Sequence, residues 1–318
     1  MLLHAFVSKV RPRMETTVAP AAVRRRIGMS KSRRAEARFA YLLLLPALLL
    51  VFVFRIFPLG WGFLISLTDA TGVTSGQFIG ADNYVEAVGD PNFLASIRNT
   101  VFVLVTLPVW VMLPMLLAIL IHQGVPGGKF FRAVYFFPAV LSSVIIGSIF
   151  NVVLRYDGSF NALLKLVGIP GVDWLGSSAT ALPSLLAVQF WSTFGMGVLI
   201  FLAGMSTVNQ DLIDAAKLDG ASMRQIWMHV IIPALWPIIE FSAVVTTIGV
   251  LTSMFGLIYV LTAGGPGTAT TLPEFLIWLE QGKINRPGYA AALSMILFGM
   301  MAGLAWVQIR IMSRNTNL

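Results

Sequence analysis

The chain has 318 residues, of which 57% are apolar and 11% are charged, against about 25% charged residues in ordinary soluble domains. An apolar surplus of this size cannot be buried in one soluble core, so the composition excludes a soluble globular domain and predicts a polytopic membrane protein. The net charge is +8, but the basic residues gather at the N-terminus, which argues against a nucleic-acid partner and for a charge that orients the chain in a bilayer.

Residues 1–38 form a basic tail. They hold ten Lys and Arg residues and only two acids, Glu15 and Glu36, and they contain no apolar run of signal-peptide length. We predict a disordered cytoplasmic tail that can touch anionic lipid headgroups. The membrane domain is predicted to occupy residues 39–313.

Six segments are long and apolar enough to cross the hydrocarbon layer, which is ~30 Å thick and takes about 20 helical residues. Four of them hold no charge in their interiors, whereas the first carries Arg55 and the fifth carries Glu240. We therefore predict an all-α fold with six transmembrane helices. The predicted spans are residues 39–67, 98–121, 131–154, 182–207, 234–262 and 288–309.

The distribution of Lys and Arg predicts the orientation. With the tail inside, sixteen of the 22 Lys and Arg residues lie on the cytoplasmic side and six lie outside. This asymmetry satisfies the positive-inside rule. Six crossings then return the C-terminus to the cytoplasm, and the loop of residues 208–233 is cytoplasmic as well.

The loops on the outer side are predicted to fold rather than to remain loose. Residues 69–97 contain a turn followed by a short amphipathic helix. Residues 155–181 contain an interfacial helix that is ended by Gly168 and Pro170. Residues 263–287 begin with a tight glycine-rich turn.

The cytoplasmic loop is the most polar interval between two long apolar segments. Asn209 is positioned to cap a helix whose first turn holds Asp211. We expect a short helix over residues 214–219, ended by Gly220, and a second amphipathic run ended by Pro233. The small residues of the first helix would let the backbone of another protein approach closely.

The pattern Asp214-Ala215-Ala216-x3-Gly220-x9-Val230-x-Ile232-Pro233 resembles the EAA motif of the permease subunits of ATP-binding-cassette (ABC) importers. Asp replaces the usual Glu at the first position, and Val230 and Ile232 replace the usual Ile and Leu. The resemblance implies that this loop is a coupling helix that seats in a groove of an ATPase subunit. The implied docking surface consists of Asp214, Ala215, Ala216, Asp219, Gly220 and Ala221.

Further motifs resemble the carbohydrate-uptake branch of these permeases, of the maltose (MalF) and glycerol-3-phosphate (UgpA) type. They are Phe78-Ile79-Gly80-x2-Asn83-Tyr84, Arg98-Asn99-Thr100, Asp219-Gly220-Ala221-Ser222, Ile258 to Pro266 and Gly288 to Ser294.

The resemblance covers about residues 39–313 and implies the type I ABC importer permease fold in a bacterial plasma membrane. It also implies four kinds of partner: a second, MalG-type permease, two ABC ATPase subunits, an extracytoplasmic solute-binding protein and a sugar-like solute.

The chain offers no site for ATP hydrolysis of its own. The run from Gly124 to Phe130 looks like a phosphate-binding loop, but Gln123 stands where the first glycine should be and Phe130 replaces the magnesium-binding hydroxyl. There is no cysteine, and the three histidines lack ligand spacing. We therefore predict a protein that is not an enzyme and needs neither metal nor cofactor, with the ATPase on a separate subunit.

Polar and aromatic side chains beside glycines in the fourth predicted span suit a sugar site, because sugar rings stack on aromatics and amides bond hydroxyls. Helix packing through small residues is the competing interpretation. The fifth span offers further candidates. The predicted path residues are Gln189, Trp191, Thr193, Met196, Thr252, Ser253 and Met254.

Glu240 allows an alternative from another class of transporter. Carboxylates inside a membrane span are costly and often functional, and an ion-coupled secondary carrier would use one. The other interpretation is that Glu240, near the cytoplasmic edge, reaches headgroup water or a partner subunit. The carrier hypothesis predicts transport by this chain alone.

Overall fold

The computed structural model describes residues 31–315 except 73, 75 and 123–133. The predicted tail therefore lies mostly outside the described residues, as does the phosphate-loop-like run. The chain divides into two units, Met1–Pro58 and Leu59–Leu318. In the first, α1 (Lys31–Val51) and the π-helical turn η1 (Phe52–Ile56) lead into α2 (Phe57–Ser66), and every described side chain from 38 to 58 is exposed. Such a bare apolar helix is suited to lipid or to a partner.

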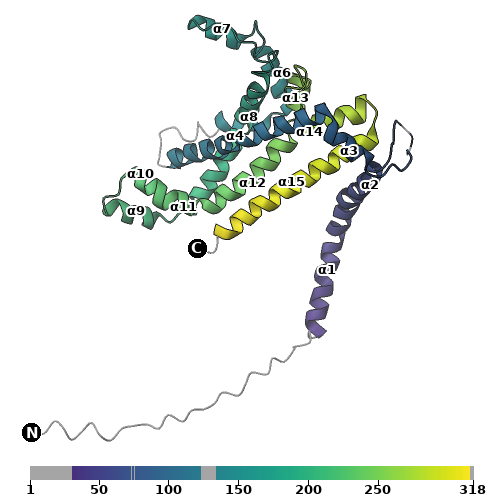
Figure 1. The fold of residues 1–318 in the computed structure, drawn as a ribbon. Helices are drawn as coiled ribbons and strands as arrows, with labels where there is room; N and C mark the ends of the chain where they lie inside the picture. The colour runs from purple at the N-terminus through teal and green to yellow at the C-terminus, as the bar shows by residue number, and fades with distance from the viewer. Residues whose placement is uncertain (1–30, 73, 75, 123–133, 316–318) are drawn as a thin grey trace, which may run out of the picture. The chain divides into compact units, whose positions relative to one another are not determined.

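The second unit is helical (Figure 1), and the described residues contain no strand beyond an isolated bridge between Thr68 and Phe78. Its helices are α3 (Asp82–Gly89), α4 (Pro91–His122), η2 (Phe137–Val140), α6 (Ser143–Val153), α7 (Ser159–Leu166), α8 (Ala181–Met205), α9 (Gln210–Leu218), α10 (Met223–Ile226), η3 (Trp227–Ile231), α11 (Ile232–Ala234), α12 (Trp236–Thr252), α13 (Phe255–Leu261), α14 (Pro273–Trp278), η4 (Leu279–Lys283) and α15 (Pro287–Asn315).

Four of the predicted spans are single helices long and apolar enough to cross a membrane: Arg38–Ser66, Pro91–His122, Ala181–Met205 and Pro287–Met312. The described residues hold up to six spans if each of two bent helix pairs counts as one. The third predicted span is bent by 111° between 140 and 143, and the helices that lead into the fifth are bent by 66° at Leu235. The third span, predicted as one continuous helix, is therefore interrupted, and the fifth begins at a bend.

The fifth predicted span is also broken further along, between α12 and α13. Thr252 donates a hydrogen bond to the carbonyl of Ile248 at 2.7 Å, and the Ser253 hydroxyl bonds the carbonyl of Gly249. A helix end leaves its last carbonyls without partners. Hydroxyl side chains that bond back one turn compete with the helical ladder and favour such a break.

The core runs along α4, α8 and α12. One buried cluster around Leu185, Val250 and Leu257 joins the three helices to α13 and α14, and a second cluster lies nearer α9. Close packing of α8 depends on Gly195, where a Cβ atom would lie 1.9 Å from the Tyr135 carbonyl oxygen.

The predicted short helices at the α3 end of the bundle are present. Helix α3 is tied to the preceding strand-like turn by Asn83, whose amide donates to the carbonyls of Ser66 and Thr68 at 2.8 Å each. Arg286 lies 2.6 Å from Glu86 in an ion pair that joins α3 to the start of α15. Figure 1 shows α7 and α9 at opposite ends of the bundle.

Candidate functional site

The first helix of the polar loop forms with the predicted Asn209 cap. Asn209 accepts a hydrogen bond from the Asp211 N–H at 2.9 Å, so α9 runs from Gln210 to Leu218 and includes most of the run expected over residues 214–219. An Asn cap satisfies one of the N–H groups that a helix start leaves open, and an acid in the first turn suits the helix dipole. Local chemistry therefore fixes where this helix begins.

The same helix ends in a Schellman motif. The N–H of Gly220 bonds the carbonyl of Lys217 and the N–H of Ala221 bonds the carbonyl of Ala216, both at 3.0 Å. Gly220 has a φ of +79°, the left-handed conformation that this motif requires and that favours glycine. The position of Gly220, four residues after Ala216, thus has a backbone reason in addition to the lack of a side chain.

A capping box starts the next helix immediately afterwards. The Ser222 N–H donates to the Gln225 side chain at 2.8 Å while the Ser222 hydroxyl accepts from the Gln225 N–H. This reciprocal pair satisfies two helix-start N–H groups at once. Residues 209–226, which we call the α9–α10 corner, are therefore held by contacts only two to five residues apart.

Pro233 does not end the second run as predicted. It lies inside α11, and the bend follows at Leu235. The π-helical turn η3 directly precedes α11 and widens the backbone there, which accommodates a proline that donates no N–H to the helical ladder.

The corner has one buried face and one exposed face. Ile213 is 7% exposed and packs with Ile226 and Ile231 in the second core cluster. Among the predicted docking residues, Asp214, Ala215, Asp219 and Gly220 are exposed, whereas Ala216 and Ala221 are half-buried. The exposed residues lie on the face of α9 that points away from the bundle.

Sequence reasoning missed two large apolar side chains on this face. Leu218 is 89% exposed and Leu212 is 56% exposed. Leu218 follows Asp214 and Ala215 by four and three positions, so helical spacing places it on the same surface. Leu212 and Leu218 make the exposed face of α9 partly apolar.

Asp214 is held by its own helix. The Lys217 ammonium lies 3.0 Å from its Oδ1, and the Gln210 amide donates to the same atom at 3.3 Å. These hydrogen bonds, the Lys217 bond first, keep the pKa of Asp214 below its usual value. The carboxylate is ionised and oriented at neutral pH.

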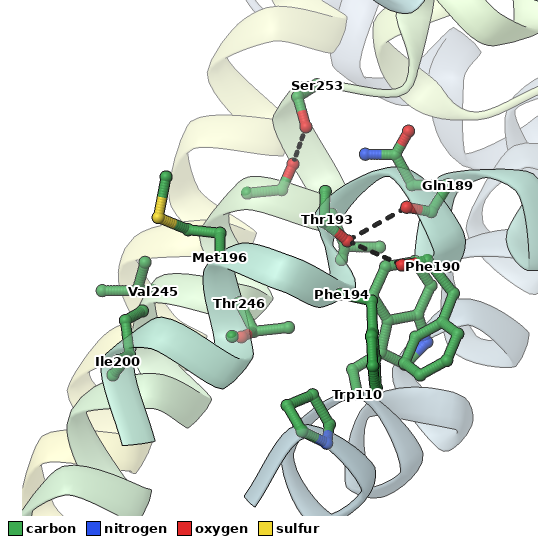
Figure 2. A pocket seen from close by; sticks show the side chains of 14 residues that line it. Trp110, Gln189, Phe190, Thr193, Phe194, Met196, Ile200, Val245, Thr246 and Ser253 are labelled. Carbon is green, nitrogen blue, oxygen red and sulfur yellow. Dashed lines mark hydrogen bonds between the residues drawn. The ribbon is translucent and has the colours of Figure 1, made fainter. Parts of the chain in front are cut away.

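A cavity of about 170 Å³ lies between α4, α8 and α12. Four of the seven predicted path residues line it: Gln189, Thr193, Met196 and Ser253. Figure 2 shows the polar groups of Gln189, Thr193 and Ser253 gathered toward one end of this central cavity.

The side chain of Gln189 lines the central cavity. Gln189 is only 5% exposed, and its side chain makes no hydrogen bond to any other residue that the structure describes. The Thr193 hydroxyl instead donates to the Gln189 backbone carbonyl at 3.0 Å. The amide opens on the cavity, where a hydroxyl group could donate to its oxygen or accept from its nitrogen.

The other three predicted path residues do not line the central cavity. Trp191 lies on the other side of α8, edge-on to Phe150 at 5.3 Å, and lines a second, apolar cavity of about 470 Å³. Met254 is fully buried in the core, and Thr252 bonds its own helix. Neighbours in a helical sequence point about 100° apart, so a run of polar and aromatic residues cannot all face one cavity.

The sequence also did not lead us to predict that three aromatic side chains line the central cavity. Phe190 and Phe194 stack edge-to-face at 5.2 Å, and Trp110 of α4 meets Phe190 at 5.3 Å. Figure 2 shows these rings beside Thr193. The spacing of four between the two phenylalanines was a signal for one shared face, but nothing in the sequence places Trp110 next to them.

Glu240 lies in the first turns of α12, near the α9 end of the bundle. Its Oε1 accepts a hydrogen bond from the Trp236 indole at 2.7 Å. It does not line the central cavity. Among the described residues, no three His, Asp or Glu side chains come together in a way that could hold a metal ion.

The chain matches the protein family described as "Binding-protein-dependent transport system inner membrane component" over residues 94–309. It is 31% identical to the trehalose/maltose transport system permease protein MalF of Thermococcus litoralis, over 89% of this chain and 96% of that protein. It is 32% identical to the multiple sugar-binding transport system permease protein MsmF of Streptococcus mutans, over 84% and 93% of the two chains. It also superposes on a chain of a bacterial ABC transporter involved in alginate import with a TM-score of 0.78, at 21% identity, over 89% of this chain and 98% of that one.

Proposed function

Because the chain belongs to the inner-membrane component family of binding-protein-dependent transport systems, we propose that it forms half of the path of an ATP-driven importer for a sugar or sugar-like solute. The α9–α10 corner carries the proposal: it presents a preformed, partly apolar surface that suits docking to another protein. The central cavity supplies the second element, a site with an unpaired amide beside aromatic rings.

The solute class is supported by two independent lines. The named relatives transport trehalose, maltose or several sugars, and the structural neighbour imports a polysaccharide. The central cavity offers what a sugar needs, since the ring faces of Phe190 and Phe194 can stack on a pyranose and Gln189 can bond its hydroxyls. At about 170 Å³, the cavity of this chain accommodates one sugar unit, and a second permease would complete a larger site.

The proposed assembly contains this chain, a second homologous permease of the MalG type, two ATPase subunits and an extracytoplasmic solute-binding protein. The exposed helix of Arg38–Ser66 supports a partner in the membrane. We propose that Asp214, Ala215, Asp219, Gly220 and the flanking Leu218 contact an ATPase, with Ala216 and Ala221 supporting that surface from the half-buried side. ATP hydrolysis then belongs to the partner subunit, and this chain is not an enzyme.

The several apolar helices make this an inner-membrane protein. We propose that both termini and the α9–α10 corner face the cytoplasm and that the α3, α7 and α14 end faces outward. The positive-inside distribution of Lys and Arg supports this orientation. Residues 39–313 then form the permease domain, with the coupling loop at 208–233.

In this mechanism, nucleotide binding brings the two ATPases together and shifts the α9–α10 corner. The bundle then exchanges between states in which the central cavity opens to one side or the other, and the nucleotide selects between them. The corner suits this role because its short-range hydrogen bonds keep it rigid while it is displaced.

The ion-coupled alternative has less support. Glu240 lies outside the central cavity and is hydrogen-bonded to Trp236, whereas a coupling carboxylate would need to face the transported solute or ion. The family of the chain also favours the importer.

The test is to co-express this chain with its partner permease and ATPase and to compare Leu218→Arg with Leu166→Arg. Leu166 is 83% exposed on α7, at the opposite end of the bundle. The importer proposal predicts that Leu218→Arg abolishes co-purification of the ATPase and that Leu166→Arg does not. Solute transport by this chain alone in liposomes, without any ATPase, would contradict the proposal.

A further inference from the structure

Two adjoining cavities near the start of α8 share no lining residue with the central cavity. The first is the apolar cavity of about 470 Å³ that Trp191 lines, which we call the apolar groove. The second has a volume of about 360 Å³ and is lined by Arg98 of α4, by the turn before α8 and by Ala269. Ala179 and Pro183 line both, so the two cavities meet at the start of α8.

Compact side chains form the floor of the apolar groove. Ala179, Pro183 and Ala187 recur at a spacing of four, which places them on one face of the chain, and Trp191 continues the same stripe. All four are exposed. The helical part from Pro183 to Trp191 rises about 12 Å, which is most of the ~15 Å depth of one leaflet of a ~30 Å hydrocarbon layer.

The walls of the apolar groove present carbon rather than free polar groups. The rings of Phe160 and Trp174 lie 5.2 Å apart on one side. The Trp174 indole N–H donates to Asn161 at 2.9 Å, and the Thr180 hydroxyl donates to the carbonyl of Asp173 at 2.6 Å. Because these polar groups already have protein partners, the groove suits a hydrocarbon chain better than a sugar.

The second cavity is polar because of Arg98. Arg98 is exposed, is the one charged residue that lines this cavity, and takes part in none of the ion pairs between described residues. The neighbouring Asn99 donates to the carbonyls of Thr268 and Thr271 at 2.8 and 2.9 Å, which holds their loop against α4. The guanidinium is therefore left for an anion from outside the chain.

The chemistry of the two cavities together is that of a lipid. A guanidinium binds a phosphate group through charge-assisted hydrogen bonds, and the adjoining groove takes an acyl chain. No carboxylate lines the second cavity to receive a headgroup ammonium, which favours a headgroup with a net negative charge. An apolar helix of a partner would fill the groove but would bring no anion to Arg98.

We propose that the two cavities bind one anionic phospholipid of the outer leaflet, with its phosphate on Arg98 and one acyl chain in the apolar groove. In the proposed orientation, this end of α4 and α8 lies at the outer surface of the membrane. The site is separate from the central cavity and does not depend on which solute that cavity takes.

The experiment uses the complete importer in nanodiscs of phosphatidylcholine with a trace of a lipid that carries a photoactivatable diazirine on one acyl chain. The labelled lipid is either phosphatidylglycerol or phosphatidylcholine, and mass spectrometry locates the label after illumination. We expect phosphatidylglycerol to label residues 179–191 about fivefold more than phosphatidylcholine does, the effect of one Arg beside an anionic lipid.

Two variants test the two parts of the site. Arg98→Gln is expected to lower the labelling by phosphatidylglycerol to the level of phosphatidylcholine, whereas Arg55→Gln, the same change away from both cavities, keeps the fivefold ratio. Ala187→Leu fills the floor of the groove and is expected to lower labelling by both lipids. Its control is Ala302→Leu at an exposed position of α15. Complex yield and melting temperature separate a folding defect from a loss of binding.

Three outcomes would overturn the proposal. Equal labelling of residues 179–191 by the two lipids would remove the headgroup contact with Arg98. Unchanged labelling in Ala187→Leu would place the acyl chain outside the groove. Labelling by neither lipid would show that another subunit covers the groove. Solute uptake is not the readout, so each of these results leaves the proposed transport function standing.

Discussion

The α9–α10 corner is held by hydrogen bonds between residues that are close in sequence, whereas the central cavity is formed by residues that are far apart in sequence. Every cap of the corner, from Asn209 to Gln225, joins residues no more than five positions apart. The cavity brings together Trp110, Gln189 and Ser253 from α4, α8 and the end of α12. The corner therefore keeps its shape when the bundle moves, whereas the cavity changes shape whenever its helices shift.

This difference suits the two regions to different tasks. A region that must pass a displacement from an ATPase to the membrane helices works best when it is stiff, and capped helix ends supply that stiffness. A site that must bind a solute and then release it needs walls that can separate. The broken fifth span and the unpaired Gln189 amide are features of such a site.

The largest expected effect is on the helix packing that surrounds the cavity. Gly195→Ala places a Cβ atom 1.9 Å from the Tyr135 carbonyl oxygen, a backbone atom that cannot turn away, and overpacking of this kind costs about 1–3 kcal/mol or more. We expect a large loss of folded complex and a lower Tm in detergent. Gly303→Ala on α15 is the control, because nothing lies within 4 Å of its added Cβ. Equal melting temperatures for the two variants would show that α8 does not pack as described.

The next largest effect tests whether capped helix ends make the α9–α10 corner stiff. Gly220→Val forces a β-branched residue into a φ of +79°, at a cost of about 1–2 kcal/mol, without any collision, since nothing lies within 4 Å of the added Cβ. Transport per ATP hydrolysed should fall while solute KM stays unchanged. Gly220→Asn should retain most of the coupling because Asn tolerates this conformation. If both variants couple equally well, the backbone of Gly220 is not what matters.

A smaller effect tests whether the central cavity binds the solute. Gln189→Ala removes the unpaired amide and should raise the KM for uptake about threefold to tenfold, the range for one hydrogen bond to a neutral solute, with little change in ATPase docking. Trp191→Phe on the opposite face of α8 should leave KM within about twofold, because Trp191 contacts Phe150 and not the central cavity. A reversed order of the two KM values would move the solute site to the other face of α8.

The family and the all-α importer fold could be predicted from the sequence and are confirmed by the match over residues 94–309 and by the structural superposition. Within the corner, the Asn209 cap and the stop at Gly220 could be predicted because their partners lie within one helical turn. The predicted stop at Pro233 was wrong because a π-turn accommodates the proline.

The cavity could be predicted only in part. Helical spacing relates Gln189, Thr193 and Met196 to one face, but Trp191 was grouped with them although it points elsewhere. Trp110 could not have been found, because its contact with Phe190 depends on which helices pack together over a separation of eighty residues. The predicted docking residues of the corner and the predicted path residues both remain to be tested by the variants above.

The smallest expected effect concerns Asp214. Its pKa is held below the usual value by Lys217, so the pair is fully formed above the ordinary carboxyl pKa and is lost only in acid, as the pH falls through the lowered value. Coupling through the corner should therefore not vary between pH 6 and 8. Asp214→Glu should leave ATPase stimulation by the loaded binding protein within about twofold, since an exposed pair contributes little. Asp214→Lys sets like charges one turn apart and should lower that stimulation, so normal stimulation in the Lys variant would remove Asp214 from the docking surface and leave Leu218 as its centre.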